Sequence, residues 1–214
     1  MLDFSCKTPY EDLDFRALEA VCKSCTQCPL SETRNQVVFG AGPVSADIMV
    51  IGEAPGEQED LKGEPFIGRS GQLLTKIFES VNIDRKKDVY IANTVKCRPP
   101  KNRTPVASEI KTCRPFLIRQ IQLIKPKVLI LLGAPALKTI LEEPLAISKV
   151  RGNWYQGKVP YMTAPLHVMP LFHPSYLLRN HRTKKDGPKW QTWKDINEIK
   201  SVIDFYQKSP LVSQ

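Results

Sequence analysis

The chain of 214 residues lacks several features that would place it in a class at once. It has no apolar run of about 18 residues, so the sequence predicts no membrane-spanning helix. Its N-terminus, MLDFSCKTPYEDLDF, lacks the basic start and apolar stretch of a signal peptide, so we expect a cytoplasmic protein whose thiols stay reduced. It has neither an internal repeat nor a low-complexity linker. These absences favour a single globular domain over residues 1–214, expected to be a monomer.

Acidic residues are scarce relative to basic ones. The 22 Asp and Glu residues face 31 Lys and Arg residues, which gives a net charge of +9. Such an excess favours an anionic partner, nucleic acid before an acidic membrane surface, although an ordinary basic protein can carry the same charge. The basic residues concentrate in CRPPKNR at 97–103 and RNHRTKKDGPK at 179–189, whereas GEQED at 56–60 is acidic. This clustering indicates nucleic acid as the partner and no membrane.

Short apolar runs alternate with amphipathic segments along the chain. Runs of this length that end at turn residues predict buried strands, and apolar residues three and four apart predict helices. The alternation predicts a three-layer α/β/α fold with a central, mainly parallel four-stranded sheet. Thr104 and Pro105 are interpreted as the N-cap and first residue of one helix. The predicted strands are 46–52, 88–95, 127–133 and 167–172, and the predicted helices are 10–24, 71–83, 105–124, 134–141 and a last one containing Trp193, Ile196, Ile199, Ile203 and Tyr206.

Polar side chains stand at or just after the ends of three of these strands. Glu53 follows the first strand, Asn93 lies in the second and His173 follows the fourth. Ligands of such sheets bind outside the carboxyl ends of the strands, so we expect these three groups to share one crevice. The GEAPG turn lacks the Lys-Ser/Thr of a phosphate-binding loop and is not G-x-G-x-x-G, which argues against a nucleotide. Taken alone, Glu53 is better interpreted as a solvated turn residue.

Five of the six cysteines fall into two groups. CKSCTQC at 22–28 holds three, Cys97 and Cys113 form a widely spaced pair, and Cys6 stands alone. In a reducing compartment such a set indicates metal ligands rather than disulfides. Zinc usually takes two C-x2-C pairs, whereas iron–sulfur clusters accept varied spacing, so the pattern favours iron–sulfur over zinc, with buried free cysteines as a third alternative. A structural site would tie the N-terminal helix and cysteine loop, at about 10–30, to the rest of the domain.

Four separated motifs together resemble the family 4 uracil-DNA glycosylases, the iron–sulfur branch of the uracil-DNA glycosylase superfamily. They are GEAPGEQEDLKGEPFIGRSGQLL at 52–74, NTVKCRPPKNRTP at 93–105, the C-x15-C pair, and HPSYLLRN at 173–180. The resemblance runs in order over about residues 18–205 and implies a uracil-DNA glycosylase-like fold. It also implies a 4Fe–4S cluster, which leaves Cys22 and Cys6 outside the ligand set. The implied ligands are Cys25, Cys28, Cys97 and Cys113.

The resemblance also assigns roles in a uracil pocket. It implies that Glu53 and His173 are catalytic, with Glu53 facing the sugar and His173 contacting uracil O2. Ala54 differs from the glutamine of a relative that links covalently to DNA, so we expect ordinary turnover. The implied pocket residues are Gly52, Glu53, Ala54, Glu59 near the pyrimidine 5-position, Phe66 stacking on the base, Asn93 reading it, and His173.

The segment after His173 is predicted to hold the DNA. Leu177 or Leu178 would enter the gap left by a flipped base, and Arg179 and Arg182 would bind phosphates. The implied activity is that of a monofunctional uracil-DNA glycosylase in base-excision repair, acting on uracil-containing DNA, since no lysine stands out as a Schiff-base nucleophile.

Two alternatives account for part of the sequence. A non-catalytic iron–sulfur or zinc nucleic-acid-binding module explains both the charge and the cysteines. A redox protein explains the cysteines alone. Neither explains why Glu53, Asn93 and His173 occur at three strand ends.

Overall fold

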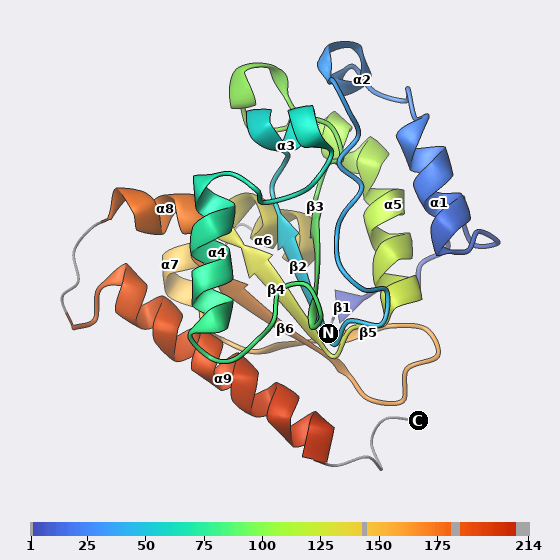
Figure 1. Cartoon of the computed structure of the whole chain (residues 1–214). Coiled ribbons are helices and arrows are strands. Elements are labelled where there is room, and N and C mark those ends of the chain that lie inside the picture. The colour runs from blue at the N-terminus through green and yellow to red at the C-terminus, as the bar shows by residue number, and fades with distance from the viewer. Residues whose placement is uncertain (1, 143–144, 181–184, 209–214) are drawn as a thin grey trace.

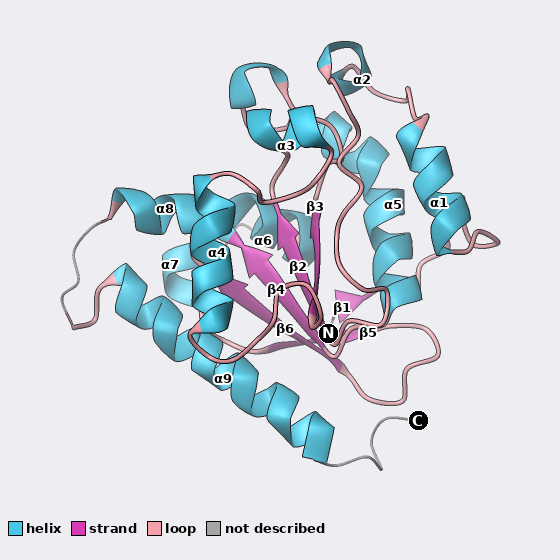
Figure 2. Cartoon of the chain, in the orientation of Figure 1, coloured by secondary structure: helices cyan, strands magenta, loops and turns pink. Residues whose placement is uncertain are grey.

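The computed structural model describes residues 2–142, 145–180 and 185–208. Six strands form one sheet in the order β1-β5-β6-β4-β2-β3, and helices lie on both of its faces (Figure 1, Figure 2). The predicted three-layer α/β/α architecture is therefore confirmed, but the predicted count of four strands is wrong. The strands are β1 (Leu2–Asp3), β2 (Ile48–Gly52), β3 (Val89–Asn93), β4 (Val128–Leu132), β5 (Tyr155–Lys158) and β6 (Leu166–Leu171).

The four predicted strands form the parallel centre of the sheet. Strand β2 pairs in parallel with β3 and β4, and β4 pairs in parallel with β6. Strand β5 pairs antiparallel with β6, and β1 extends the edge beyond it. The sequence of β5, YQGK, is mostly polar and only one of its residues is buried, so it carries no apolar run that would predict a strand.

The central strands read as continuous apolar runs because both faces of the sheet are covered. Every residue of β2, β3 and β4 is buried. Within β2, Ile48 and Val50 point to one hydrophobic cluster, whereas Met49 and Ile51 point to another on the opposite face. This alternation lets two helical layers pack on one sheet.

The helices divide between the two faces (Figure 1). Residues of α4 and α9 pack in the cluster of Ile48, and residues of α5 and α6 pack in that of Met49. In α9, Trp193 is 53% exposed and stands outside the predicted apolar face. The helices are α1 (Phe15–Lys23), α2 (Leu30–Thr33), α3 (Glu57–Lys62), α4 (Arg69–Glu79), α5 (Ala107–Ile124), α6 (Gly133–Leu141), α7 (Ile147–Val150), α8 (Pro174–Arg179) and α9 (Pro188–Lys208), with a 3-10 turn at Pro100–Asn102.

Helix α5 begins two residues later than the sequence predicts. Its N-cap is Val106, not Thr104, and the Glu109 carboxylate accepts a hydrogen bond from the Val106 N–H at 2.8 Å. An acidic side chain in the first turn thus satisfies an amide that the helix itself leaves free.

A third hydrophobic cluster joins α1 to α5. It contains Leu18 and Cys22 of α1, Cys97 after β3, and Phe116 of α5. The Arg119 guanidinium of α5 donates to the Leu13 carbonyl just before α1 at 2.8 Å. Within the described residues, no helix combines the length and apolar character needed to cross a membrane.

Candidate active site

A cleft of about 580 Å³ opens where the central strands end. Glu53 and Ala54, which follow β2, line it together with Asn93 at the end of β3 and His173 after β6. The volume lies within the range of small-molecule sites. The three strand-end groups singled out in the sequence therefore share one cleft, because the carboxyl ends of parallel strands lie at the same edge of the sheet.

Asn93 presents an unsatisfied acceptor in this cleft. The residue is 1% exposed, and its Oδ1 is the one buried side-chain polar atom of the described residues that has no hydrogen-bond partner. A Cβ at Gly52 would lie 2.4 Å from that Oδ1 and 2.6 Å from the Phe66 ring, so only glycine leaves room here. A buried acceptor without a donor costs about 1–3 kcal/mol, which indicates that a ligand supplies the donor.

Glu53 is fixed through its backbone. Its carbonyl oxygen accepts hydrogen bonds from the Thr94 hydroxyl at 2.5 Å and the Val95 N–H at 3.4 Å, and the Thr94 N–H donates to the Gly52 carbonyl at 3.0 Å. The turn after β2 is thereby tied to the end of β3. Glu53 and Asn93 are consequently held in a fixed relation, and Thr94, which the sequence does not single out, provides the link.

The His173 ring is held in one tautomer. His173 caps α8, and its Nδ1 accepts the Ser175 N–H at 3.1 Å and lies 2.8 Å from the Ser175 hydroxyl oxygen. An acceptor Nδ1 places the proton of the neutral ring on Nε2. Burial, with the charge of Arg179, lowers the pKa of His173 to about 4. At neutral pH the ring is therefore uncharged and offers an Nε2–H donor.

We expect the His173 ring signal to titrate near pH 4 in an NMR pH series, well below the ordinary value of 6.5. Because the folded pKa lies below the unfolded one, His173 does not affect stability at neutral pH and destabilises the fold as the pH falls from about 6.5 to about 4. His173→Gln identifies the signal by removing it. A midpoint near 6.5 would contradict the neutral, partly buried ring.

Phe66 and Glu59 form one wall of the cleft. The Phe66 and His173 ring centroids are 5.7 Å apart. One carboxylate oxygen of Glu59 accepts the N–H groups of Ile67 at 3.0 Å and Gly68 at 2.9 Å. Glu59 therefore lies where the sequence places it, on the wall, and its carboxylate also fixes the loop that carries Phe66.

The segment after His173 divides into buried and accessible parts. Arg179 lines the cleft, and a neighbouring cleft of about 450 Å³ shares Glu53, His173 and Arg179 with it. Leu177 is 1% exposed in α8 and packs inward, so a wedge formed by Leu177 is wrong for this conformation. Leu178 is partly exposed and remains the candidate. Arg182 lies outside the described residues.

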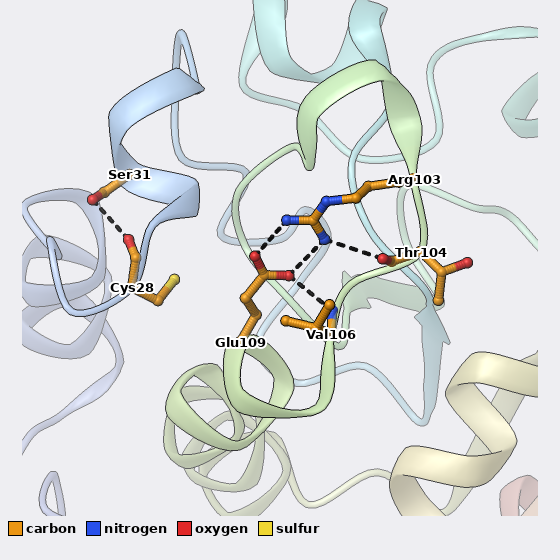
Figure 3. Close-up of polar contacts among 6 residues, drawn as sticks. All are labelled: Cys28, Ser31, Arg103, Thr104, Val106 and Glu109. Carbon is orange, nitrogen blue, oxygen red and sulfur yellow. Dashed lines mark hydrogen bonds and ion pairs between the residues drawn. The ribbon is translucent and has the colours of Figure 1, made fainter.

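Arg103, which the sequence reading placed only within a basic loop, also lines the cleft. Its guanidinium binds both carboxylate oxygens of Glu109 at 2.6 and 2.9 Å and donates to the Thr104 carbonyl at 3.1 Å (Figure 3). Glu109 is 3% exposed, so the pair joins the loop firmly to the start of α5. These contacts fix the position of Arg103 at the cleft. They join residues on either side of a turn, and no local sequence pattern predicts them.

A separate small cavity is lined by five free thiols. The sulfur of Cys97 lies 3.3 Å from Nη1 of Arg34, and the buried Lys96 also lines the cavity. Ser31 closes the cysteine loop by donating to the Cys28 carbonyl at 2.8 Å (Figure 3). Among the described residues, no three ligating side chains are arranged around a single metal ion. The thiols are those of Cys22, Cys25, Cys28, Cys97 and Cys113, whereas Cys6 is exposed elsewhere.

This donor set fits a thiolate-bound metal group. Burial raises the pKa of the Cys113 thiol to about 12, and it also raises the pKa values of Cys22 and Cys97. Buried thiols of this kind stay protonated at neutral pH unless a metal takes the place of the proton. The Arg34 guanidinium beside Cys97 favours a group of net negative charge, whereas burial lowers the pKa of Lys96.

The comparisons with known proteins all point to the same family. The model of the uracil DNA glycosylase superfamily matches residues 39–197. A type-4 uracil-DNA glycosylase of Thermotoga maritima is 45% identical, over 85% of this chain and 90% of that protein. Another, of Pyrobaculum aerophilum, is 39% identical over 78% of this chain and 86% of its own length. A type-5 uracil-DNA glycosylase of the same organism is 29% identical over 64% of each chain.

Proposed function

Because the chain belongs to the uracil DNA glycosylase superfamily and, within it, to the type-4 uracil-DNA glycosylases, we propose that it hydrolyses the N-glycosidic bond of deoxyuridine in DNA. The reaction releases uracil and leaves an abasic site, the first step of base-excision repair. One observation carries the proposal: the buried, unpartnered oxygen of Asn93 lies in a cleft shared with Glu53 and His173.

Base recognition rests on the Asn93 carboxamide. A base inside a duplex is out of reach, so the nucleotide must be flipped into the cleft, where Phe66 stacks on it. The Asn93 oxygen accepts from uracil N3–H, and its amide group donates to O4. Cytosine reverses both groups and leaves buried polar atoms mismatched, an error that a hydrogen-bonding site can reject by about 10⁴–10⁵-fold.

Bond cleavage rests on two groups of opposite character. As the bond breaks, positive charge develops on the sugar and negative charge on the departing uracil. The Glu53 carboxylate stabilises the first and positions the attacking water. The Nε2–H of neutral His173 donates to uracil O2 and stabilises the second, as a fixed donor does in an oxyanion hole. The tautomer imposed by Ser175 supports this assignment.

Residues that line the cleft are proposed to bind the DNA backbone. Arg69 and Arg179 line the cleft and would bind phosphates, and Leu178 would fill the space that the flipped base leaves. The described lining of the cleft contains no lysine. We therefore expect a monofunctional enzyme that leaves the strand uncut.

The thiol cavity would hold a 4Fe–4S cluster through Cys25, Cys28, Cys97 and Cys113. Iron–sulfur clusters accept four thiolates at varied sequence spacing, which supports a cluster over zinc. When bound, the group supplies a cross-link between the loop before α2, the segment after β3 and helix α5. Cys22, on α1, lies in the same cavity as a neighbour.

We expect Cys25→Ala to lose iron and visible absorbance and to melt at a lower temperature, because it removes one ligand. Cys22→Ala should keep its iron and lose only packing, and Cys6→Ala, at an exposed site, is the matched control. Iron analysis and thermal melting measure the difference. If Cys25→Ala keeps its iron and Cys22→Ala loses it, Cys22 is the ligand and Cys25 is the neighbour.

The function is tested on oligonucleotides that carry one uracil, cytosine or thymine, followed by alkali. Strand cleavage at uracil alone, and only after alkali, is the expected result. Binding without cleavage at any base would replace the proposal with a non-catalytic DNA-binding module. Cleavage without alkali would contradict the monofunctional mechanism.

A further inference from the structure

Phe66 has an unusual backbone for the residue proposed to stack on uracil. Its φ is +52°, in the left-handed region that favours glycine. A bulky residue in that region is a genuine outlier, and such strain persists only where surrounding contacts impose it. The contacts that impose it here therefore bear directly on where the Phe66 ring stands.

The carbonyl side of this segment is held by Arg85. Its guanidinium donates to the Pro65 carbonyl through Nη2 at 2.8 Å and to the Phe66 carbonyl through Nη1 at 2.8 Å. The amide side is held by Glu59, which accepts the next two N–H groups. A Cβ at Gly71 would lie 1.6 Å from the Phe66 carbonyl oxygen, so helix α4 presses against the same point.

Arg85 is itself anchored. Its Nη1 also contacts the Thr75 hydroxyl at 3.0 Å and the Gly71 carbonyl at 3.3 Å. The turn that carries it is closed by Asp84 and Asp88: the Asp84 N–H donates to the Asp88 carboxylate at 2.7 Å, and the Asp88 N–H donates to the Asp84 carbonyl at 2.8 Å. A planar guanidinium can bridge two carbonyls in a way that a lysine ammonium cannot.

Phe66 lines both the active-site cleft and a second cleft of about 910 Å³. Arg85 lines this second cleft together with Thr75, and it does not line the active-site cleft. Arg85 therefore touches neither the reacting bond nor the base. Its influence on the reaction has to pass through the Phe66 backbone.

We infer that Arg85 is a positioning residue for base capture, which sets the Phe66 ring at the stacking distance by fixing the Pro65 and Phe66 carbonyls. The inference rests on the proposed function and extends it to a residue outside the cleft. It assigns Arg85 to binding of the flipped base, in the ground state and the transition state alike, and leaves bond cleavage to Glu53 and His173.

The test is Arg85→Ala, with Arg119→Ala as the matched control. Arg119 is also a partly buried arginine that donates to a backbone carbonyl, but it lies on α5 and lines neither cleft. In Arg85→Ala we expect a rise of about tenfold in KM for uracil-containing DNA and in the inhibition constant of free uracil, the size of a lost base–aromatic stack. The kcat should change by less than about twofold, and the control should keep both constants.

Chemical rescue separates positioning from mere stability. Because Arg85 lines an open cleft, added guanidinium ion should enter the space in Arg85→Ala and restore uracil inhibition, whereas sodium chloride at equal ionic strength should not. If Arg85→Ala does not fold, Arg85→Lys decides, since it keeps the charge but cannot bridge both carbonyls; a raised KM at unchanged kcat is then expected.

Wild-type constants in the variant that folds would overturn the inference and leave the proposed function intact. Equal losses in Arg85→Ala and Arg119→Ala would overturn it too, as a general loss of stability. Failure of the proposed function would instead show as a wild-type protein that releases no uracil.

Discussion

Glu53→Gln is expected to slow uracil release by about 10²–10³-fold, the loss typical of removing one preorganised electrostatic group. Glutamine keeps the shape and the backbone contacts of Glu53, so the cleft stays open. It removes the negative charge that faces the sugar as the bond breaks. DNA affinity should not fall, because the carboxylate repels phosphate and does not hold it. Single-turnover release of uracil, with DNA binding measured in parallel, gives both quantities.

Glu57→Gln is the matched control for this change. Glu57 lies four residues away on α3, its side chain is 64% exposed, and it does not line the cleft. It should keep the wild-type rate. A Glu53→Gln protein that retains more than about a tenth of that rate would contradict the role of the carboxylate in cleavage.

Asn93→Asp is expected to lower the ratio of uracil to cytosine excision by about 10³-fold or more, from the 10⁴–10⁵ that a matched polar site can reach. The donor that faces uracil O4 becomes an acceptor, which repels uracil and suits the amino group of cytosine. Because Asn93 is buried, the mismatch is not relieved by water. Excision rates on matched uracil and cytosine oligonucleotides give the ratio.

Two further variants serve as controls for Asn93→Asp. Asn93→Ala should lose uracil excision without gaining cytosine excision, since it offers no hydrogen bond to either base. Asn197→Asp, on the exposed side of α9, makes the same chemical change far from the cleft and should leave the ratio unaltered. An unchanged ratio in Asn93→Asp would remove Asn93 from base reading.

The sequence predicts the centre of the fold because the central strands are apolar on both faces. Strands β2, β3, β4 and β6 each coincide with an apolar run. The edge is different: β1 has two residues, and β5 owes its strand to pairing with β6. Such pairing depends on residues distant in sequence, so no local pattern contains it.

The same division holds for the candidate site. Glu53, Asn93 and His173 were predicted to converge because each stands at a strand end, and the cleft contains all three. Their supports were not predictable. Ser175 acts by fixing the tautomer of the His173 ring. In the sequence, Arg85 is one of several charged residues in the segment DRKKD, which has the composition of a solvated loop, yet its guanidinium binds the Phe66 carbonyl. Ser175 and Arg85 each act through a contact that exists only in the folded structure. Serine and arginine occur in many other roles, so the residue type alone does not predict these contacts.

Gly52 limits how this protein can be redesigned. Any side chain there would overlap the Asn93 oxygen and the Phe66 ring, so a mutant library that varies position 52 will consist mainly of damaged clefts. Ala54 lines the same cleft and already carries a side chain, whereas Glu59 also holds the loop of Phe66 through the Ile67 and Gly68 N–H groups. Directed evolution towards other damaged bases therefore has its useful diversity at position 54, with glycine kept at 52 and glutamate at 59.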